Sequence, residues 1–176
     1  MNTNRSAFLD AIGVSEGTTT SSSTRNHGYD VIVTGPAGPE VFTDYADHPF
    51  MHRAPKAVNS KGLCSTASGK YQIMIHDWPH YKALLSLPDF GPASQDLMAI
   101  QLIRERSALP LIDAGQFDLA VGRCSNLWAS FTGAGYGQHE QTIGFLRDAY
   151  LSAGGRLTGS EPAPDATASW GNEARR

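Results

Sequence analysis

The chain has 176 residues, enough for one globular domain but too few for a second independent core. Hydrophobic residues make up 40% of it and charged residues 18%, and its 18 glycines and 10 prolines indicate a fold rich in loops. The net charge is −3, and no stretch is basic enough to follow a phosphate backbone, which excludes nucleic acid as the main partner.

The cysteines and the apolar runs narrow the class of protein further. Cys64 and Cys124 are too few for a disulfide framework and lack the spacing of metal ligands, so we expect two reduced core thiols. The first ten residues lack the apolar run of a secretory signal, and no segment approaches the roughly 18 apolar residues of a membrane span. We therefore expect accumulation in the cytoplasm and no stable membrane association.

The first predicted element is a helix over residues 6–18. Apolar residues recur there at helical spacing, and the line Phe8, Ile12, Glu16 aims a carboxylate toward the side that the helix buries. Gly17 supplies a C-terminal stop because glycine adopts the left-handed closing conformation at no steric cost.

Glu16 is our candidate catalytic acid. In the last turn the helix dipole disfavours an ionised carboxylate by roughly 0.3–1 kcal/mol, and burial acts in the same direction. Both effects raise the pKa, as a general acid working near neutral pH requires. The alternative is an ordinary helix that ends in Glu-Gly with the glutamate turned to solvent.

A small antiparallel hairpin should follow the first helix. Residues 18–30 are polar and read as a surface loop, whereas residues 29–34 and 40–44 are short β-branched runs separated by glycines and prolines. Residues 45–63 carry two prolines and should be irregular.

The remainder reads as mostly helical. Residues 68–85 carry apolar residues at helical spacing, with Pro79 kinking or dividing the helix, and residues 92–109 carry so wide an apolar stripe that we expect a central buried helix. Further helical segments and one glycine-rich turn complete the domain: helices at 110–114, 117–123, 125–129 and 140–152, and the turn at 133–137.

The composition changes near the C-terminal end. Residues 1–155 form the predicted domain, whereas residues 156–176 contain proline, small residues and charges without periodicity and should be disordered or loosely laid on the surface. A hairpin beside a mostly helical remainder predicts an α+β fold with two lobes and a cleft that suits an extended polymer.

Six runs in this order resemble the lambda-type phage endolysins. They are SEGT (15–18), TRNHGYDVIV (24–33), FTDYADHP (42–49), ALPLID (108–113), CSNLWAS (124–130) and GAGYGQ (133–138). The resemblance covers roughly residues 5–155. It implies a lysozyme-like fold, mainly helical with a small β-hairpin lobe.

The resemblance also implies an activity. It is that of a peptidoglycan lytic transglycosylase, which breaks the β-1,4 bond from N-acetylmuramic acid to N-acetylglucosamine without water and leaves a 1,6-anhydro end. A glycosidase normally needs two carboxylates, but here one acid first donates a proton and then accepts one. The acid of the family's SEGT motif falls on Glu16.

The segment 68–72, which contains Ser68, Tyr71 and Gln72, resembles the SxGxYQ pattern of lysozyme-like cell-wall enzymes. The Gln72 amide could bind a sugar N-acetyl group, and the Ser68 hydroxyl could bind the acid or the sugar. Tyr71 belongs to the same candidate substrate site, the alternative being that it is simply a core residue.

Tyr136 lies among glycines, which allow close backbone approach to a ligand, and a tyrosine offers a sugar both a packing face and a hydroxyl. We expect it beside Glu16, the alternative being a buried tyrosine in a glycine-rich turn. His48 lies in a matching family run and is a further candidate to shape a loop or contact sugar.

Asp30 completes the candidate substrate-binding residues. Asp30, Asp44 and Asp47 lie in or near the hairpin, where a hydrolase would keep its second carboxylate. The alternative is that Asp44 and Asp47 organise turns by binding nearby backbone amides.

No metal or other cofactor is expected. His76 and His80 are four residues apart, as in a zinc helix, but no glutamate occupies the general-base position and Pro79 perturbs the helix between them. A zinc amidase or peptidase is disfavoured because its ligand set is missing.

Two other functions remain open. They are a hydrolytic muramidase and a catalytically silent peptidoglycan-binding protein of the same fold. Because the chain resembles phage endolysins, we expect a monomer that is made in the cytoplasm of an infected bacterium. Release through a separate holin-type pore would give it access to the glycan strands of the periplasmic cell wall.

Overall fold

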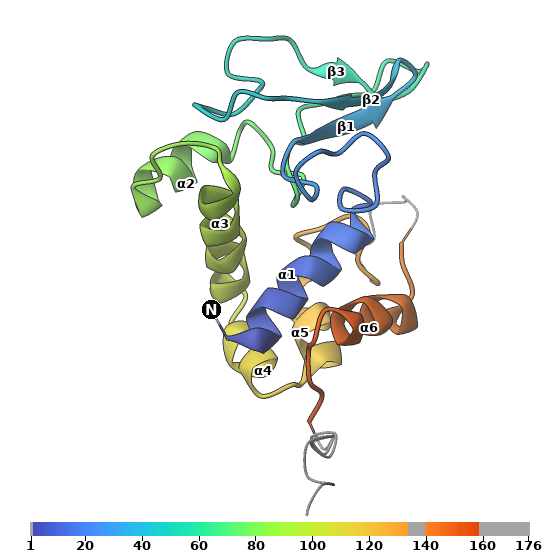
Figure 1. The fold of residues 1–176 in the computed structure, drawn as a ribbon, viewed down its shortest axis with the longest axis vertical. Helices are drawn as coiled ribbons and strands as arrows, with labels where there is room; N and C mark the ends of the chain where they lie inside the picture. The colour runs from blue at the N-terminus through green and yellow to red at the C-terminus, as the bar shows by residue number, and fades with distance from the viewer. Residues whose placement is uncertain (1, 134–139, 159–176) are drawn as a thin grey trace, which may run out of the picture.

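The computed structural model describes residues 2–133 and 140–158. Helices gather at one end of the molecule and two small sheets at the other (Figure 1). The helices are α1 (Thr3–Ser15), α2 (Trp78–Leu85), α3 (Pro92–Glu105), α4 (Leu109–Asp113), α5 (Phe117–Cys124) and α6 (Ile143–Ser152), and the strands are β1 (Val31–Gly35), β2 (Gly38–Val41), β3 (Lys56–Ala57) and β4 (Cys64–Ser65).

Helix α1 lies at the centre of the helical part, with α6 alongside it (Figure 1). Its N-terminus is capped by Asn2, whose side chain accepts a hydrogen bond from the Asn4 amide at 2.9 Å. Phe8 and Ile12 are buried, as their spacing predicts. The C-terminal end of α1, capped by Glu16, points toward the β1–β2 hairpin.

The predicted hairpin is confirmed. β1 and β2 are antiparallel, with Val31 opposite Val41 and a register irregularity before Gly35. A Cβ on Gly35 would come 2.0 Å from the Ala57 carbonyl oxygen, so glycine lets β3 approach β1 closely.

A second small sheet was not predicted. β3 and β4 pair antiparallel through Lys56–Ser65 and Ala57–Cys64, so the segment we expected to be irregular contains a strand. Strands of two residues are too short for an alternating pattern to reveal.

The helix predicted over residues 68–85 is wrong in its first half. Residues 68–77 form turns, and Gly69 and Gln72 have positive φ angles of 76° and 50° that no α-helix accommodates. Ser68 pairs with both Ile32 and Ile73, which folds the segment back onto β1. Only α2 is helical, with Pro79 in its first turn, where proline is tolerated.

The remaining helices agree with prediction except at one place. α3 is confirmed, but it is not buried on all sides, since Leu97 is 54% exposed. α4, α5 and α6 lie where expected, whereas residues 125–129 form turns rather than a helix.

The two cysteines have different environments. Cys124 is buried in the core, and burial raises the pKa of its thiol to about 12. Cys64 is exposed, so the expectation of two core thiols is wrong for it. Both are free.

Residues 156–158, which we assigned to the tail, are held by the domain. The Arg156 amide donates to Asn4 Oδ1 at 2.9 Å, and the Arg156 carbonyl accepts from the Tyr150 hydroxyl at 3.0 Å. The Thr158 amide donates to the Gly115 carbonyl at 3.0 Å. Residues 156–158 thus pack with the domain, and residues 159–176 lie outside the described residues.

None of the helices in the described ranges combines the length and apolar character needed to cross a bilayer.

Candidate functional site

Glu16 follows the last residue of α1 and is partly buried. The Ser130 hydroxyl donates to its Oε1 atom at 2.6 Å, and the Ser15 hydroxyl donates to Ser130 Oγ at 2.7 Å. Burial raises the pKa of the Glu16 carboxyl, and hydrogen bonds from the Ser130 hydroxyl and backbone oppose this only in part. The Glu16 carboxyl therefore keeps its proton to a higher pH than an ordinary glutamate does.

The turn that carries Ser130 is fixed by buried aromatic residues on either side of it. The Trp128 indole donates to the Tyr71 carbonyl at 3.1 Å, and Phe131 packs edge-on against Phe8 of α1 with ring centroids 6.2 Å apart. These contacts hold Ser130 beside the end of α1, although 114 residues separate it from Glu16.

Gln72 shares this scaffold. It follows Tyr71, whose carbonyl anchors Trp128, so the turns carrying Gln72 and Ser130 are joined by a direct hydrogen bond. Gln72 is partly exposed, and its left-handed backbone is unusual for a residue with a side chain. Its Nε2 atom donates to the Gly69 carbonyl at 3.1 Å, and among the described residues no donor binds its side-chain oxygen, which can therefore accept from a ligand.

Ser68 and Tyr71 are buried, which contradicts direct contact with a sugar. Ser68 is 0% exposed, and its hydroxyl donates to the Thr66 carbonyl at 3.1 Å. Tyr71 is 2% exposed, and its hydroxyl donates to Asp96 Oδ1 at 2.5 Å. The alternative reading of Tyr71 as a core residue is the one that fits.

His48 and Asp30 are also inside the molecule, which likewise contradicts direct sugar contact. The His48 Nε2–H donates to the Ile73 carbonyl at 3.0 Å, and burial lowers the pKa of the imidazole. Asp30 accepts hydrogen bonds from the Thr24 hydroxyl at 2.5 Å and the Arg25 amide at 2.8 Å. Both side chains shape loops of the β lobe.

Asp44 and Asp47 organise turns, as the alternative reading proposed. Asp44 accepts from the Ala46 amide at 2.9 Å. Asp47 accepts from the His48 amide at 2.9 Å and from Lys82 Nζ at 2.7 Å. Partial burial would raise the Asp47 pKa, but its hydrogen bonds outweigh this and lower it.

Tyr136 lies outside the described residues, so its expected place beside Glu16 stays a prediction. Within the described ranges, no three His, Cys, Asp or Glu side chains lie close enough to hold a metal ion. His76 is exposed and lies 3.3 Å from Asp77, its neighbour in the chain.

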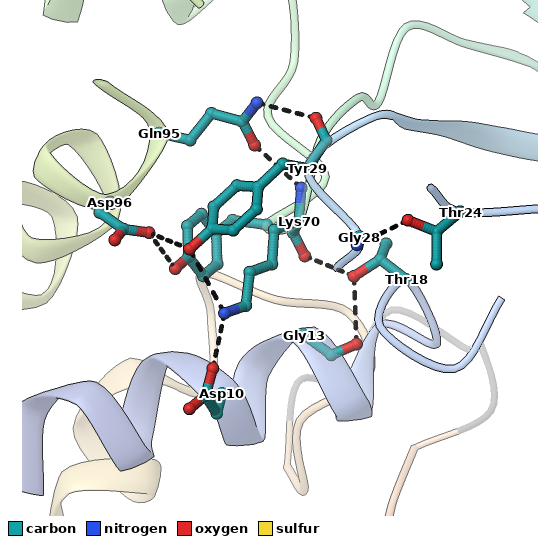
Figure 2. A network of polar contacts seen from close by, with 10 residues as sticks. Asp10, Gly13, Thr18, Thr24, Gly28, Tyr29, Lys70, Gln95 and Asp96 are labelled. Atoms are coloured by element: carbon teal, nitrogen blue, oxygen red, sulfur yellow. Dashed lines mark hydrogen bonds and ion pairs between the residues drawn. The ribbon is translucent and has the colours of Figure 1, made fainter. Parts of the chain in front are cut away.

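A buried lysine that the sequence did not single out joins α1, the β lobe and α3 (Figure 2). Lys70 Nζ binds Asp10 Oδ1 of α1 at 2.6 Å and lies 4.9 Å from the centroid of the Tyr29 ring. The Tyr29 hydroxyl donates to Asp96 Oδ1 of α3 at 2.8 Å, the same oxygen that accepts from Tyr71. This network, which we call the Lys70 network, sets the position of α1 relative to the β lobe.

Glu16 lines neither of two pockets found among the described residues. A pocket of about 740 Å³ between α1 and α6 is lined by Asp10, Val14, Lys70 and Phe145, among others. Residues 10 and 14 of α1 point roughly opposite to residues 12 and 16, so this pocket opens away from the acid. A second pocket, of about 550 Å³, lies within residues 41–53. Glu16 is thus a candidate because of its burial and raised pKa and not because of a pocket.

Comparison with known proteins gives the family. The family model described as Endolysin matches residues 6–157. The endolysin of Escherichia phage P2 is 56% identical over 154 residues, which cover 86% of this chain and 93% of the phage protein. This chain belongs to the endolysin family.

Further relatives of this endolysin include that of Escherichia phage lambda, 50% identical over 158 residues that cover 89% of this chain and 95% of the relative. The solved structure of bacteriophage lambda lysozyme complexed with a chitohexasaccharide is 49% identical, with a TM-score of 0.82, and the match covers 89% of this chain and 97% of that one. A second structure of the lambda lysozyme is 47% identical with a TM-score of 0.77. The predicted α+β lysozyme-like fold and the lambda-type endolysin family are confirmed.

Proposed function

We propose that this endolysin is a peptidoglycan lytic transglycosylase in which Glu16 is both acid and base. The observation that carries the proposal is one carboxyl, partly buried at the end of α1, whose pKa is raised by burial. A group that must first donate and then accept a proton needs a pKa close to the working pH.

The reaction needs no external water. The Glu16 carboxyl gives its proton to the oxygen that links C1 of N-acetylmuramic acid to the next sugar, and the C1–O bond breaks. The muramoyl 6-hydroxyl then attacks C1 and gives its proton to the Glu16 carboxylate. The products are a free 4-hydroxyl and a 1,6-anhydro end, and the acid is regenerated.

The state of three other carboxylates, Asp30, Asp44 and Asp47, supports a single-carboxylate mechanism. A retaining hydrolase holds a second carboxylate about 5–5.5 Å from the acid, and an inverting one holds it farther away. Asp30 has both oxygens engaged by its own loop, and Asp44 and Asp47 organise turns. These three candidates are thus committed to structure.

The substrate is proposed to be the glycan strand of peptidoglycan. A chitohexasaccharide is bound in the related lambda lysozyme structure, and such a chain shares its amino-sugar character with the glycan strand. We assign Gln72 to a sugar N-acetyl group and retain Tyr136 as a sugar contact. Synthesis in an infected cell's cytoplasm, action as a monomer and release through a separate holin-type pore belong to the same proposal.

Digestion of purified murein followed by mass spectrometry tests the reaction type. The transglycosylase yields muropeptides with anhydromuramic ends, each lighter by one water than the hydrolytic product. Free reducing ends would instead establish a hydrolytic muramidase, and an intact polymer would leave only glycan binding.

The role of Glu16 is tested by Glu16→Gln, which keeps the size and hydrogen-bonding shape of the side chain but cannot donate an acidic proton. We expect murein lysis to fall by roughly two to four orders of magnitude, with glycan binding retained. Glu105→Gln, at an exposed carboxylate on α3, is the matched control and should lyse like the parent protein. Substantial lysis by Glu16→Gln would place the acid elsewhere.

A further inference from the structure

Two serine hydroxyls form a line of hydrogen bonds that ends at the candidate acid. The Ser15 hydroxyl lies 2.7 Å from Ser130 Oγ, and the Ser130 hydroxyl lies 2.6 Å from Glu16 Oε1. Ser15 belongs to α1 and Ser130 to the turn after α5, so the line joins two separate parts of the chain at the acid. Ser15 is only 5% exposed, which limits replacement of its hydrogen bond by water.

The direction of this line follows from counting protons. An ionised carboxylate can only accept hydrogen bonds, and a serine hydroxyl has one proton to donate. Ser130 therefore donates to Glu16, and its own oxygen is free to accept the Ser15 proton. Each donor in the line strengthens the next by polarising it.

Each partner in the line is held from a different side. Ser15 is fixed by the last turn of α1. Ser130 is fixed by Trp128, which binds the Tyr71 carbonyl, and by Phe131, which packs on Phe8. The acid is thus tied to a point outside its own helix, as precise placement of a catalytic group requires.

We propose that Ser130 is a positioning residue for this reaction and that Ser15 acts through it, so that Oε1 of Glu16 is fixed and Oε2 carries the catalytic proton. The inference rests on the proposed function, because it assigns Glu16 as the acid. No side chain of the described residues hydrogen-bonds to Oε2. Since Oε1 is already an acceptor, the line keeps its direction when Oε2 loses its proton to the glycan and when it regains one.

The electrostatic surroundings of the acid are simple in the described part of the chain. Burial raises the Glu16 pKa, whereas the hydroxyl and backbone of Ser130 lower it, and no charged side chain is among the causes. Glu140, the acid that binds the Gly133 amide at 2.7 Å in the neighbouring turn, is not among them. Loss of the Ser130 hydroxyl should therefore raise the pKa further.

The first test is Ser130→Ala, assayed for its pH–rate profile on soluble glycan strands. We expect the alkaline limb, where the acid loses its proton, to move to higher pH. The turnover rate should fall roughly ten- to hundredfold, the scale of one hydrogen bond to a charged group, while KM changes little. Ser130→Thr keeps a hydroxyl and should restore the parent profile in large part.

The second test is the pair Ser15→Ala and Ser15→Ala/Ser130→Ala. Because Ser15 acts only through Ser130, Ser15→Ala should shift the alkaline limb of the pH–rate profile less than Ser130→Ala does. Adding Ser15→Ala to Ser130→Ala should cause no further shift. Ser125→Ala is the matched control, since its hydroxyl donates to the Gly122 carbonyl at 3.1 Å on an exposed turn.

Three outcomes would overturn the inference. They are an unchanged limb in Ser130→Ala, a rate loss accompanied only by a lower melting temperature, and a Ser15 effect that persists in full without Ser130. Failure of the proposed function is a separate result, because it would appear as lysis by Glu16→Gln or as free reducing ends in the murein digest.

Discussion

Glu16, the proposed catalytic acid, also affects the stability of the fold. Its raised pKa means that the folded state binds this proton more tightly than the unfolded chain does. Stability from this group is therefore fully present below the ordinary carboxyl pKa and is lost as the pH rises through the raised value. Above the raised pKa, the charge of this partly buried carboxylate is a cost to the fold.

Glu16→Gln should consequently melt at a higher temperature than the parent protein at pH 7. The difference should close as the pH is lowered below the ordinary carboxyl pKa of about 4.3, where both side chains are neutral. Calorimetry at a series of pH values measures this. A variant that is less stable than the parent at pH 7 would contradict the sign of the pKa shift.

At the residue scale the sequence singled out Glu16 as the candidate acid but gave no sign of Ser130, its hydrogen-bond partner. Glu16 is one turn beyond Ile12 on a buried helix face, and that spacing is local. Ser130 reaches Glu16 only because Trp128 and Phe131 anchor a distant turn, and no local pattern specifies such a contact. Ser68 and Tyr71 were named as substrate residues from a motif, which gives order along the chain and not exposure, and the structure buries both.

The elements were predictable where their period is sustained over several turns. α1, α3 and α6 each repeat an apolar face and were found near their observed bounds. In residues 68–77 the apolar spacing came from a turn that buries Tyr71 and Ile73 beside β1, and the positive φ angles that create it leave no sign in hydropathy.

The contact between α1 and the β lobe depends on the Lys70 network. In Asp10→Asn, the Lys70 ammonium, 6% exposed, would lose its ion-pair partner while staying buried. Asp10 is itself 49% exposed, which moderates the effect. We expect the free energy of unfolding to fall by about 1–3 kcal/mol, measured by urea denaturation.

Asp118→Asn is the matched control for this change. Asp118 pairs with Arg147 between α5 and α6, but both side chains are more than a third exposed. Its loss should cost less than about 0.5 kcal/mol. Equal effects of the two substitutions would show that burial of Lys70 does not matter.

On the scale of the whole molecule, residues 156–158 close the domain. A chain that ends after Thr158 should keep the melting temperature of the full chain. A chain that ends after Gly155 loses the hydrogen bonds of Arg156 and Thr158 and the packing of Leu157, and should melt roughly 5–10 °C lower. Identical melting of the two truncated chains would refute this role.

The bond from the Arg156 amide to Asn4 also joins the beginning of the described chain to its end. Local fraying at one end therefore cannot proceed without loosening the other, since the first turn of α1 and the segment after α6 share that contact. Unfolding that starts at either end must therefore break the contacts of both ends, and this favours cooperative unfolding over stepwise loss of structure from one end.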